Sequence, residues 1–69
     1  MDQETKRGTI TTIYHKGYGF ISQENGTEIF FHKTGVCNTD FNDLREGFEV
    51  DYLVSSSPRG TKAIGIVIL

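Results

Sequence analysis

The chain has 69 residues, which is enough for one domain and too few for two. Seven Lys and Arg stand against nine Asp and Glu, and the formal net charge of −2 argues against a ligand held mainly by phosphate neutralisation. The single cysteine, Cys37, excludes an internal disulfide, and two histidines are too few for a zinc-type ligand cluster.

The N-terminal end is predicted to be a polar tail over residues 1–6, followed by one domain over residues 7–69. No apolar run lies in or behind the tail. We therefore expect neither a secretory signal nor a membrane span, and a cytoplasmic protein that works without disulfides.

Three strands are predicted in the first half of the chain. Residues 9–14 are dense in β-branched and aromatic side chains and stop at a Lys-Gly step, as a first strand would. Residues 18–22 and 27–32 predict a second and a third strand, and the Asn-Gly pair between them is a strong signal for a tight hairpin. These two strands should therefore lie side by side and antiparallel.

Two further strands are predicted in the second half. Residues 33–46 are rich in Gly, Asn and Asp and predict a long loop. Residues 48–54 predict a fourth strand, residues 55–60 a flexible turn, and residues 61–69 a fifth strand. The fold class expected is all-β, a five-stranded antiparallel barrel of the OB type, because closure removes the sheet edges that a small chain cannot otherwise protect.

The predicted hairpin should carry an aromatic face. Side chains alternate along a strand, so Ile21 and Ile29 share one face of the hairpin and planar groups share the other. The planar set is Tyr18, Phe20, Phe30 and His32. For a hairpin in general either face can be the core, so an interior position for the rings stays open at this point.

Three features favour rings that face solvent. A histidine within the set is costly to bury without a partner. Gly17 and Gly19 would leave the backbone open to the close approach of a ligand, and Lys16 and Lys33 border the rings with positive charge. Aromatic rings with flanking cations are what base stacking and phosphate contact require.

The same residues resemble a known family. The string Lys-Gly-Tyr-Gly-Phe-Ile at residues 16–21 resembles the first RNA-binding motif of cold-shock domains, and Ile-Phe-Phe-His at residues 29–32 resembles the second. The similarity extends over about residues 7–69. The RRM uses a string like the first motif, but its second motif comes earlier in the chain and helices intervene, which this sequence does not show. The resemblance therefore implies the cold-shock type of OB-fold.

The resemblance also implies roles for particular residues. Bases would stack on the four planar groups, Phe41 would add an apolar contact from the loop, and Lys16 and Arg59 would contact phosphates or base edges. The predicted nucleic-acid-binding residues are Lys16, Tyr18, Phe20, Phe30, His32, Lys33, Phe41 and Arg59. The partner expected is single-stranded RNA or DNA, bound with little sequence preference by a monomer without cofactor or metal, in the manner of an RNA chaperone or a regulator of transcription or translation.

Two positions depart from the family pattern. The first strand usually carries a Lys-Trp-Phe-Asn stretch, whereas this chain has no Trp and is one residue shorter before Lys16. The loss of one stacked ring would weaken binding roughly 5- to 150-fold unless Tyr14 turns outward to compensate. Lys33 stands where the family often has another aromatic residue. We therefore predict micromolar affinity with a modest dependence on salt.

Two other classes of function compete with this one. A barrel that no longer binds nucleic acid could use the same rings as a protein-interaction module, which the missing Trp and the acidic net charge support. An enzyme is not predicted, because the Gly-Tyr-Gly string lacks the remaining residues of a dinucleotide fingerprint or a phosphate loop, and no nucleophile with a base can be assembled from these strands.

Overall fold

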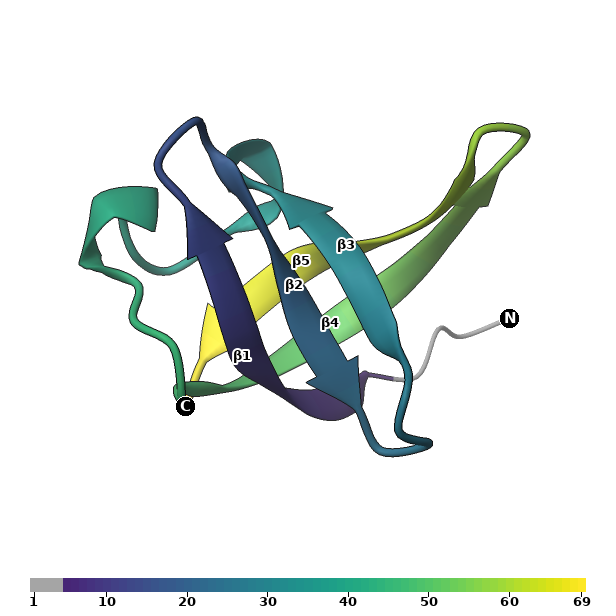
Figure 1. The fold of residues 1–69 in the computed structure, drawn as a ribbon, viewed down its shortest axis with the longest axis horizontal. Coiled ribbons are helices and arrows are strands. Elements are labelled where there is room, and N and C mark those ends of the chain that lie inside the picture. The colour runs from purple at the N-terminus through teal and green to yellow at the C-terminus, as the bar shows by residue number, and fades with distance from the viewer. Residues whose placement is uncertain (1–4) are drawn as a thin grey trace.

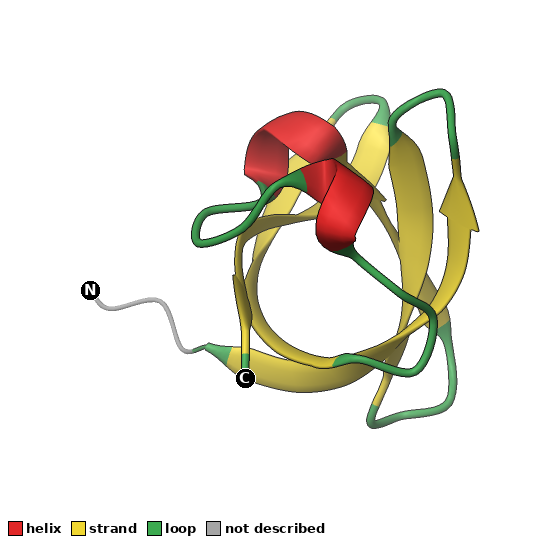
Figure 2. Cartoon of the chain, turned by 90° about the vertical axis from the view of Figure 1, so that its left-hand side faces the viewer, coloured by secondary structure: helices red, strands yellow, loops and turns green. Residues whose placement is uncertain are grey.

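The barrel is closed by five strands. The computed structural model describes residues 5–69. In chain order the strands are β1 (Lys6–Tyr14), β2 (Tyr18–Gln23), β3 (Glu28–His32), β4 (Glu49–Ser57) and β5 (Gly60–Ile68). Around the barrel their order is β1-β2-β3-β5-β4, and β1 pairs with β4 to complete the ring (Figure 1). Two short 3₁₀ helices, η1 (Lys33–Gly35) and η2 (Phe41–Asp43), lie between β3 and β4, near one end of the barrel (Figure 2).

The predicted fold class is confirmed, with one strand pair as an exception. Adjacent strands run antiparallel except for β3 and β5, which pair in parallel with Phe30 opposite Lys62 and Phe31 opposite Ala63. The barrel is therefore antiparallel as predicted apart from this one pair. The physical reason is the connection, because the chain reaches β5 through η1, η2 and β4 and not through a hairpin from β3.

Several element bounds also differ from those predicted. Strand β1 begins at Lys6, because its first residues pair with β4. Strand β4 continues to Ser57, which faces Gly60 in β5, so the turn predicted over residues 55–60 is reduced to Pro58 and Arg59. The serines are held in the strand by their pairing with β5. Their weak intrinsic preference for strands does not indicate this longer strand.

The hairpin of β2 and β3 forms as predicted. Its register sets Phe20 opposite Phe30 and Ile21 opposite Ile29. The turn uses Gly26 at a φ of +90°, a left-handed conformation that glycine adopts without strain. The Oδ1 of Asn25 accepts a hydrogen bond from the Thr27 N–H at 3.1 Å, which fixes the turn.

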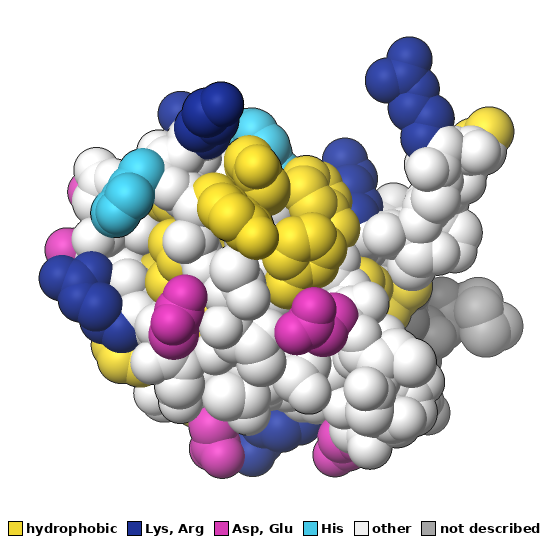
Figure 3. Space-filling view, in the orientation of Figure 1, with side chains coloured by type: hydrophobic (Ala, Val, Ile, Leu, Met, Phe, Trp, Pro, Cys, Tyr) yellow, Lys and Arg dark blue, Asp and Glu magenta, His cyan; other side chains and the backbone are white. Residues whose placement is uncertain are grey.

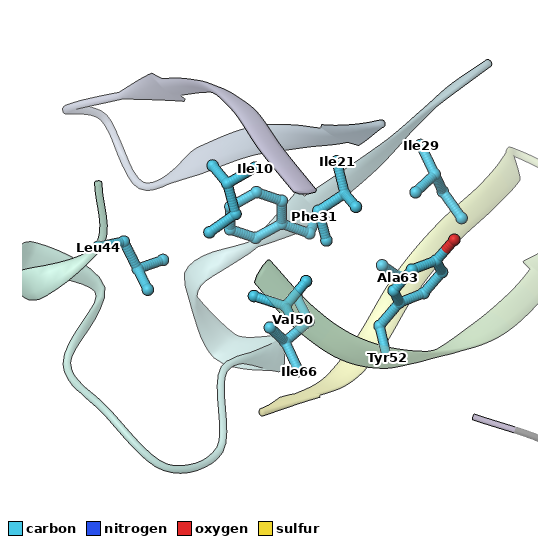
Figure 4. Packing of buried hydrophobic residues seen from close by; sticks show 9 residues of the cluster. All are labelled: Ile10, Ile21, Ile29, Phe31, Leu44, Val50, Tyr52, Ala63 and Ile66. Carbon is cyan, nitrogen blue, oxygen red and sulfur yellow. The ribbon is translucent and has the colours of Figure 1, made fainter. Parts of the chain in front are cut away.

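The barrel interior is filled by side chains from all five strands and the long loop. The buried set is Ile10, Ile21, Ile29, Phe31, Leu44, Val50, Tyr52, Ala63 and Ile66 (Figure 4). Burying each of the larger members stabilises the fold by about 1.5–3 kcal/mol. The polar end of Tyr52 is not left unpaired, since its hydroxyl donates to Oε1 of Gln23 at 3.1 Å. The predicted inward positions of Ile21 and Ile29 are thus confirmed.

A β-bulge in β1 changes which of its side chains face the interior. The register with β2 shifts between Ile10 and Thr12, so that Ile10 lies opposite Ile21 and Ile13 lies opposite Gly19. Both isoleucines therefore point toward the interior although they are three residues apart. A regular strand would place residues an even number apart on one face. After the bulge, Tyr14 lies on the outer face of the barrel.

Candidate nucleic-acid interface

Four aromatic rings meet on the outer face of β1, β2 and β3. We call this set the aromatic patch, and its members are Tyr14, Tyr18, Phe20 and Phe30. Tyr14 stacks on Tyr18 with 4.8 Å between ring centroids, and Tyr18 lies 5.8 Å from Phe30. Phe20 meets both Phe30 and Tyr14 nearly edge to face, at 6.0 and 6.4 Å. Each ring therefore contacts two others, and the patch is one continuous surface (Figure 3).

Strand pairing holds the rings of the patch in place. Phe20 and Phe30 are directly opposite one another across β2 and β3, and Tyr14 and Tyr18 are opposite across β1 and β2. Side chains of opposite residues share a face of the sheet. Tyr18, Phe20 and Phe30 are half-buried, whereas Tyr14 is exposed over 44% of its surface. The expectation that the rings at 18, 20 and 30 share an outward face is thus met by the geometry.

The two glycines of the first motif, Gly17 and Gly19, are buried and do not leave the backbone open to a ligand as predicted. Gly19 is buried and faces the interior, where an added Cβ would lie 2.8 Å from Cε1 of Phe31. The expectation that Gly19 leaves room for a ligand is therefore wrong, since the space it leaves is taken by Phe31. Gly17 is required by its backbone, which has a φ of +113°, and its carbonyl accepts the Lys33 N–H at 2.9 Å.

His32 lies at the end of the patch, opposite Tyr18. Its Nδ1 accepts a hydrogen bond from the Thr34 N–H at 3.3 Å and lies 3.0 Å from Oγ1 of Thr34. The imidazole thereby caps η1 and is held in one orientation. A half-buried planar group beside Tyr18 extends the surface on which a base can stack.

Basic side chains border the patch. Lys16 lies in the turn between β1 and β2, Lys33 begins η1, and Lys62 pairs with Phe30 from β5. In Figure 3, Lys, Arg and His side chains lie above and beside the apolar patch, while acidic side chains lie below it. Among the acidic residues, Glu28 accepts a hydrogen bond from the Thr11 hydroxyl at 2.9 Å. The field along the upper border of the patch therefore favours an anion.

A hollow of about 460 Å³ continues the patch beyond Phe30. It lies between β3 and the outer end of the β4–β5 hairpin. Its lining is Phe30, Ser55, Ser57, Arg59, Gly60, Thr61 and Lys62. Hydroxyl groups and two cations beside an aromatic ring can contact base edges and phosphates together.

Phe41 is placed differently from the other predicted rings. Its ring packs on the buried Phe31, with 6.2 Å between centroids, and it is half-buried against the core. Among residues 5–69, its ring has no aromatic contact with the patch. Its predicted contact with a ligand stays a prediction, and the geometry adds a role in packing.

Three predicted residues, Tyr18, Phe20 and Phe30, thus form part of the patch, His32 lies opposite Tyr18, and Arg59 borders the hollow. Lys16 lies in the turn between β1 and β2, and Lys33 begins η1. Sequence reasoning did not select Lys62, because the parallel pairing that brings it to Phe30 has no local signal. The sequence offers Tyr14 only as a compensating ring, because the bulge that turns it outward has no marker in the sequence. Within residues 5–69 no group of three or more His, Cys, Asp or Glu is arranged to hold a metal ion, and no helix has the length and apolar character needed to cross a membrane.

Comparison with known proteins agrees with this fold. The family described as "'Cold-shock' DNA-binding domain" matches residues 6–69. The chain is 41% identical over 54 residues to cold shock protein CspB of Geobacillus stearothermophilus, an alignment that covers 78% of this chain and 82% of that protein. It is 38% identical over 63 residues to cold shock protein 1 of Lactiplantibacillus plantarum, covering 90% of this chain and 96% of that protein.

A solved structure described as "drosophila Unr CSD456" superposes with a TM-score of 0.82 at 29% identity. The match covers 97% of this chain and 27% of that longer chain. The fold, the patch and these matches define one class, a small β-barrel with an outward aromatic surface. The chain belongs to the cold-shock DNA-binding domain family, a family of nucleic-acid-binding domains.

Proposed function

We propose that this domain binds single-stranded RNA or DNA by stacking bases on the aromatic patch, with little sequence preference. The observation that carries the proposal is the continuous outward surface of four rings, bordered on one side by lysines. Every base has a planar face, so a surface of rings accepts all four bases, whereas hydrogen-bond readout would discriminate among them.

Binding to such a surface requires unpaired bases. A base stacked on Phe20 or Phe30 cannot at the same time be stacked inside a duplex. Binding therefore shifts the folding equilibrium of nucleic-acid hairpins toward the melted form, and the shift grows with the concentration of the domain. This provides the physical basis for an RNA chaperone or a regulator of transcription or translation. Neither role involves a covalent step or a cofactor.

Stacking supplies most of the affinity in this proposal. Each stacked base contributes roughly 1–3 kcal/mol, and the net charge of −2 limits what phosphate contacts can add. If Lys16, Lys33 and Lys62 each neutralise one phosphate of a single strand, log K falls with log salt at a slope of about −2. The proposal thus combines micromolar affinity with a modest salt dependence, and nanomolar affinity at physiological salt would contradict it.

The test replaces the rings one at a time. Fluorescence anisotropy with labelled oligothymidine and oligouridine measures the affinity of the unchanged chain, of Phe20→Ala and of Phe30→Ala. We expect each substitution to weaken binding roughly 5- to 150-fold, because each removes the surface for one base. Phe48→Ala is the matched control, since Phe48 is 37% exposed and has no ring contact with the patch. Circular dichroism confirms that each variant is folded.

Two results would contradict the proposal. Equal affinity of Phe20→Ala, Phe30→Ala and Phe48→Ala would place any bound oligonucleotide elsewhere on the barrel. No binding at all by the unchanged chain would favour the alternative function, a protein-interaction module in which the patch binds a protein partner.

A further inference from the structure

We propose that Tyr14 is a base-stacking residue, so that a bound strand continues past Tyr18 onto the end of β1. This inference rests on the proposed function and deepens it, because it assigns Tyr14 the outermost stacking position of the aromatic patch. The predicted binding set does not contain Tyr14, and the pattern of the first strand in this family offers a Trp at a position where this chain has none. The structure supplies an aromatic ring at another place on the same strand.

The bulge in β1 gives Tyr14 its outward direction. Ile10 faces the interior, and in a regular strand Tyr14, four residues later, would face the interior as well. The register shift between Ile10 and Thr12 reverses this order, so Ile13 packs toward the core and Tyr14 lies opposite Tyr18 on the outer face. The sequence places small threonines at the bulge, and the aromatic ring comes after it.

The ring of Tyr14 is positioned before any ligand arrives. Its plane is inclined by only 25° to that of Tyr18 at a centroid distance of 4.8 Å, and it is nearly perpendicular to the ring of Phe20, with 6.4 Å between the centroids. Its carbonyl accepts the Gly17 N–H at 3.0 Å, which closes the turn after β1. An ordered ring loses little freedom when a base stacks on it.

The Tyr14 ring is partly open to solvent. The ring covers Tyr18 with one face, yet 44% of the surface of Tyr14 is exposed, more than for any other ring of the patch. The proposal places the base on the face of the ring away from Tyr18. A base placed there would extend the pair to a stack of three, with Tyr14 in the middle.

The charge nearby fits a strand that continues in this direction. Lys16 follows Tyr14 by two residues in an exposed turn, and Lys33 lies across from that turn, with its side chain beside Gly17. A nucleotide stacked on Tyr14 would bring its phosphate toward this pair of lysines. Thr12, opposite Phe20, offers no ring on the same strand, so stacking on β1 depends on Tyr14.

The test compares Tyr14→Ala, Tyr14→Phe and Tyr14→Leu over oligothymidines from about four to about eight nucleotides, within the usual range of site sizes for one OB-fold. We expect Tyr14→Ala and Tyr14→Leu to lose roughly 5- to 150-fold in affinity for the longer strands and much less for the shortest, which can be held on the remaining rings. Tyr14→Phe keeps the ring and should bind as the unchanged chain does. Phe48→Ala is again the control for an exposed ring outside the patch.

Three outcomes would overturn the inference. If Tyr14→Ala leaves affinity unchanged at every length while Phe20→Ala weakens it, the proposed function stands and Tyr14 has no part in it. Tighter binding by Tyr14→Ala would show that Tyr14 covers Tyr18 and competes with the base. Equal losses for Tyr14→Leu at all lengths would place Tyr14 in support of the patch and not at its end. If neither Tyr14→Ala nor Phe20→Ala changes binding, the proposed function itself fails.

Discussion

Gly19→Ala tests how closely the barrel interior is packed behind the aromatic patch. Gly19 is buried in β2, between the two outward rings Tyr18 and Phe20. A Cβ at this position would lie 2.4 Å from the Thr12 carbonyl oxygen and 2.8 and 2.9 Å from two ring atoms of Phe31. One methyl group therefore meets both a backbone atom of β1 and the ring of a fully buried side chain.

The expected cost is large for a domain of this size. At about 0.05–0.15 kcal/mol per residue, a chain of 69 residues is stable by about 3–10 kcal/mol. Overpacking costs about 1–3 kcal/mol, and the upper end applies here because the Thr12 carbonyl cannot retreat without disturbing the pairing of β1 with β2. A loss of about 3 kcal/mol corresponds to a fall in Tm of about 12–24 °C.

Urea unfolding followed by circular dichroism measures the loss. Gly35→Ala is the matched control, because the nearest atoms to its added Cβ are 3.3 and 3.4 Å away. In a double-mutant cycle, Phe31→Leu should offset only part of the loss that Gly19→Ala causes, since the contact with the Thr12 carbonyl remains. A free energy of unfolding for Gly19→Ala within about 0.5 kcal/mol of the unchanged chain would refute the reasoning.

Two further predictions concern residues beside the core. Phe41→Ala should lower the free energy of unfolding by about 1–3 kcal/mol, less than for a fully buried Phe, because its half-buried ring packs on Phe31; an unchanged urea midpoint would argue against this contact. Burial, aided by the charge of Glu24, raises the pKa of Tyr52 above its usual value of 10.0. The folded chain then holds this proton more tightly than the unfolded chain, so stability should fall as pH rises above about 10, and fall less in Tyr52→Phe. Equal pH slopes for the two proteins in urea titrations would contradict this.

The hairpin at the centre of the site could be predicted because its signals are local. The Asn-Gly pair fixes the turn, and strict alternation then decides which residues share a face. Once Ile21 and Ile29 are assigned to the interior, the outward positions of Phe20 and Phe30 follow without further information. The central part of the patch is therefore encoded within a short stretch of sequence.

The first strand could not be predicted in the same way, because its bulge interrupts the alternation. No residue type marks the place where an extra residue enters, and the polar Thr11 and Thr12 suit either face. The direction of Tyr14 depends on that one position. A reading of residues 9–14 as a regular strand would have placed its ring in the core.

Non-local pairing explains the remaining differences. The parallel join of β3 with β5 brings Lys62 to Phe30 across the long loop and the whole of β4, and neither segment carries a local signal for its partner. The same holds for Phe41, whose packing on Phe31 depends on how the loop folds over the barrel end. Tertiary contacts of this kind are decided by the assembled barrel and not by propensity.

The outer end of the β4–β5 hairpin projects from the barrel (Figure 1). Its last pairs, such as Ser56 with Thr61 and Ser57 with Gly60, join exposed residues and bury no apolar side chain. Such a segment is held by its ladder and by the hydrogen bond that the Ser57 hydroxyl donates to the Gly60 carbonyl at 3.0 Å, and its amides should exchange with solvent sooner than those of the core strands. Arg59 at the tip can thus shift its position with little strain on the barrel, and under the proposed function this freedom would let the domain accept nucleic acids whose sugar-phosphate chains follow different paths.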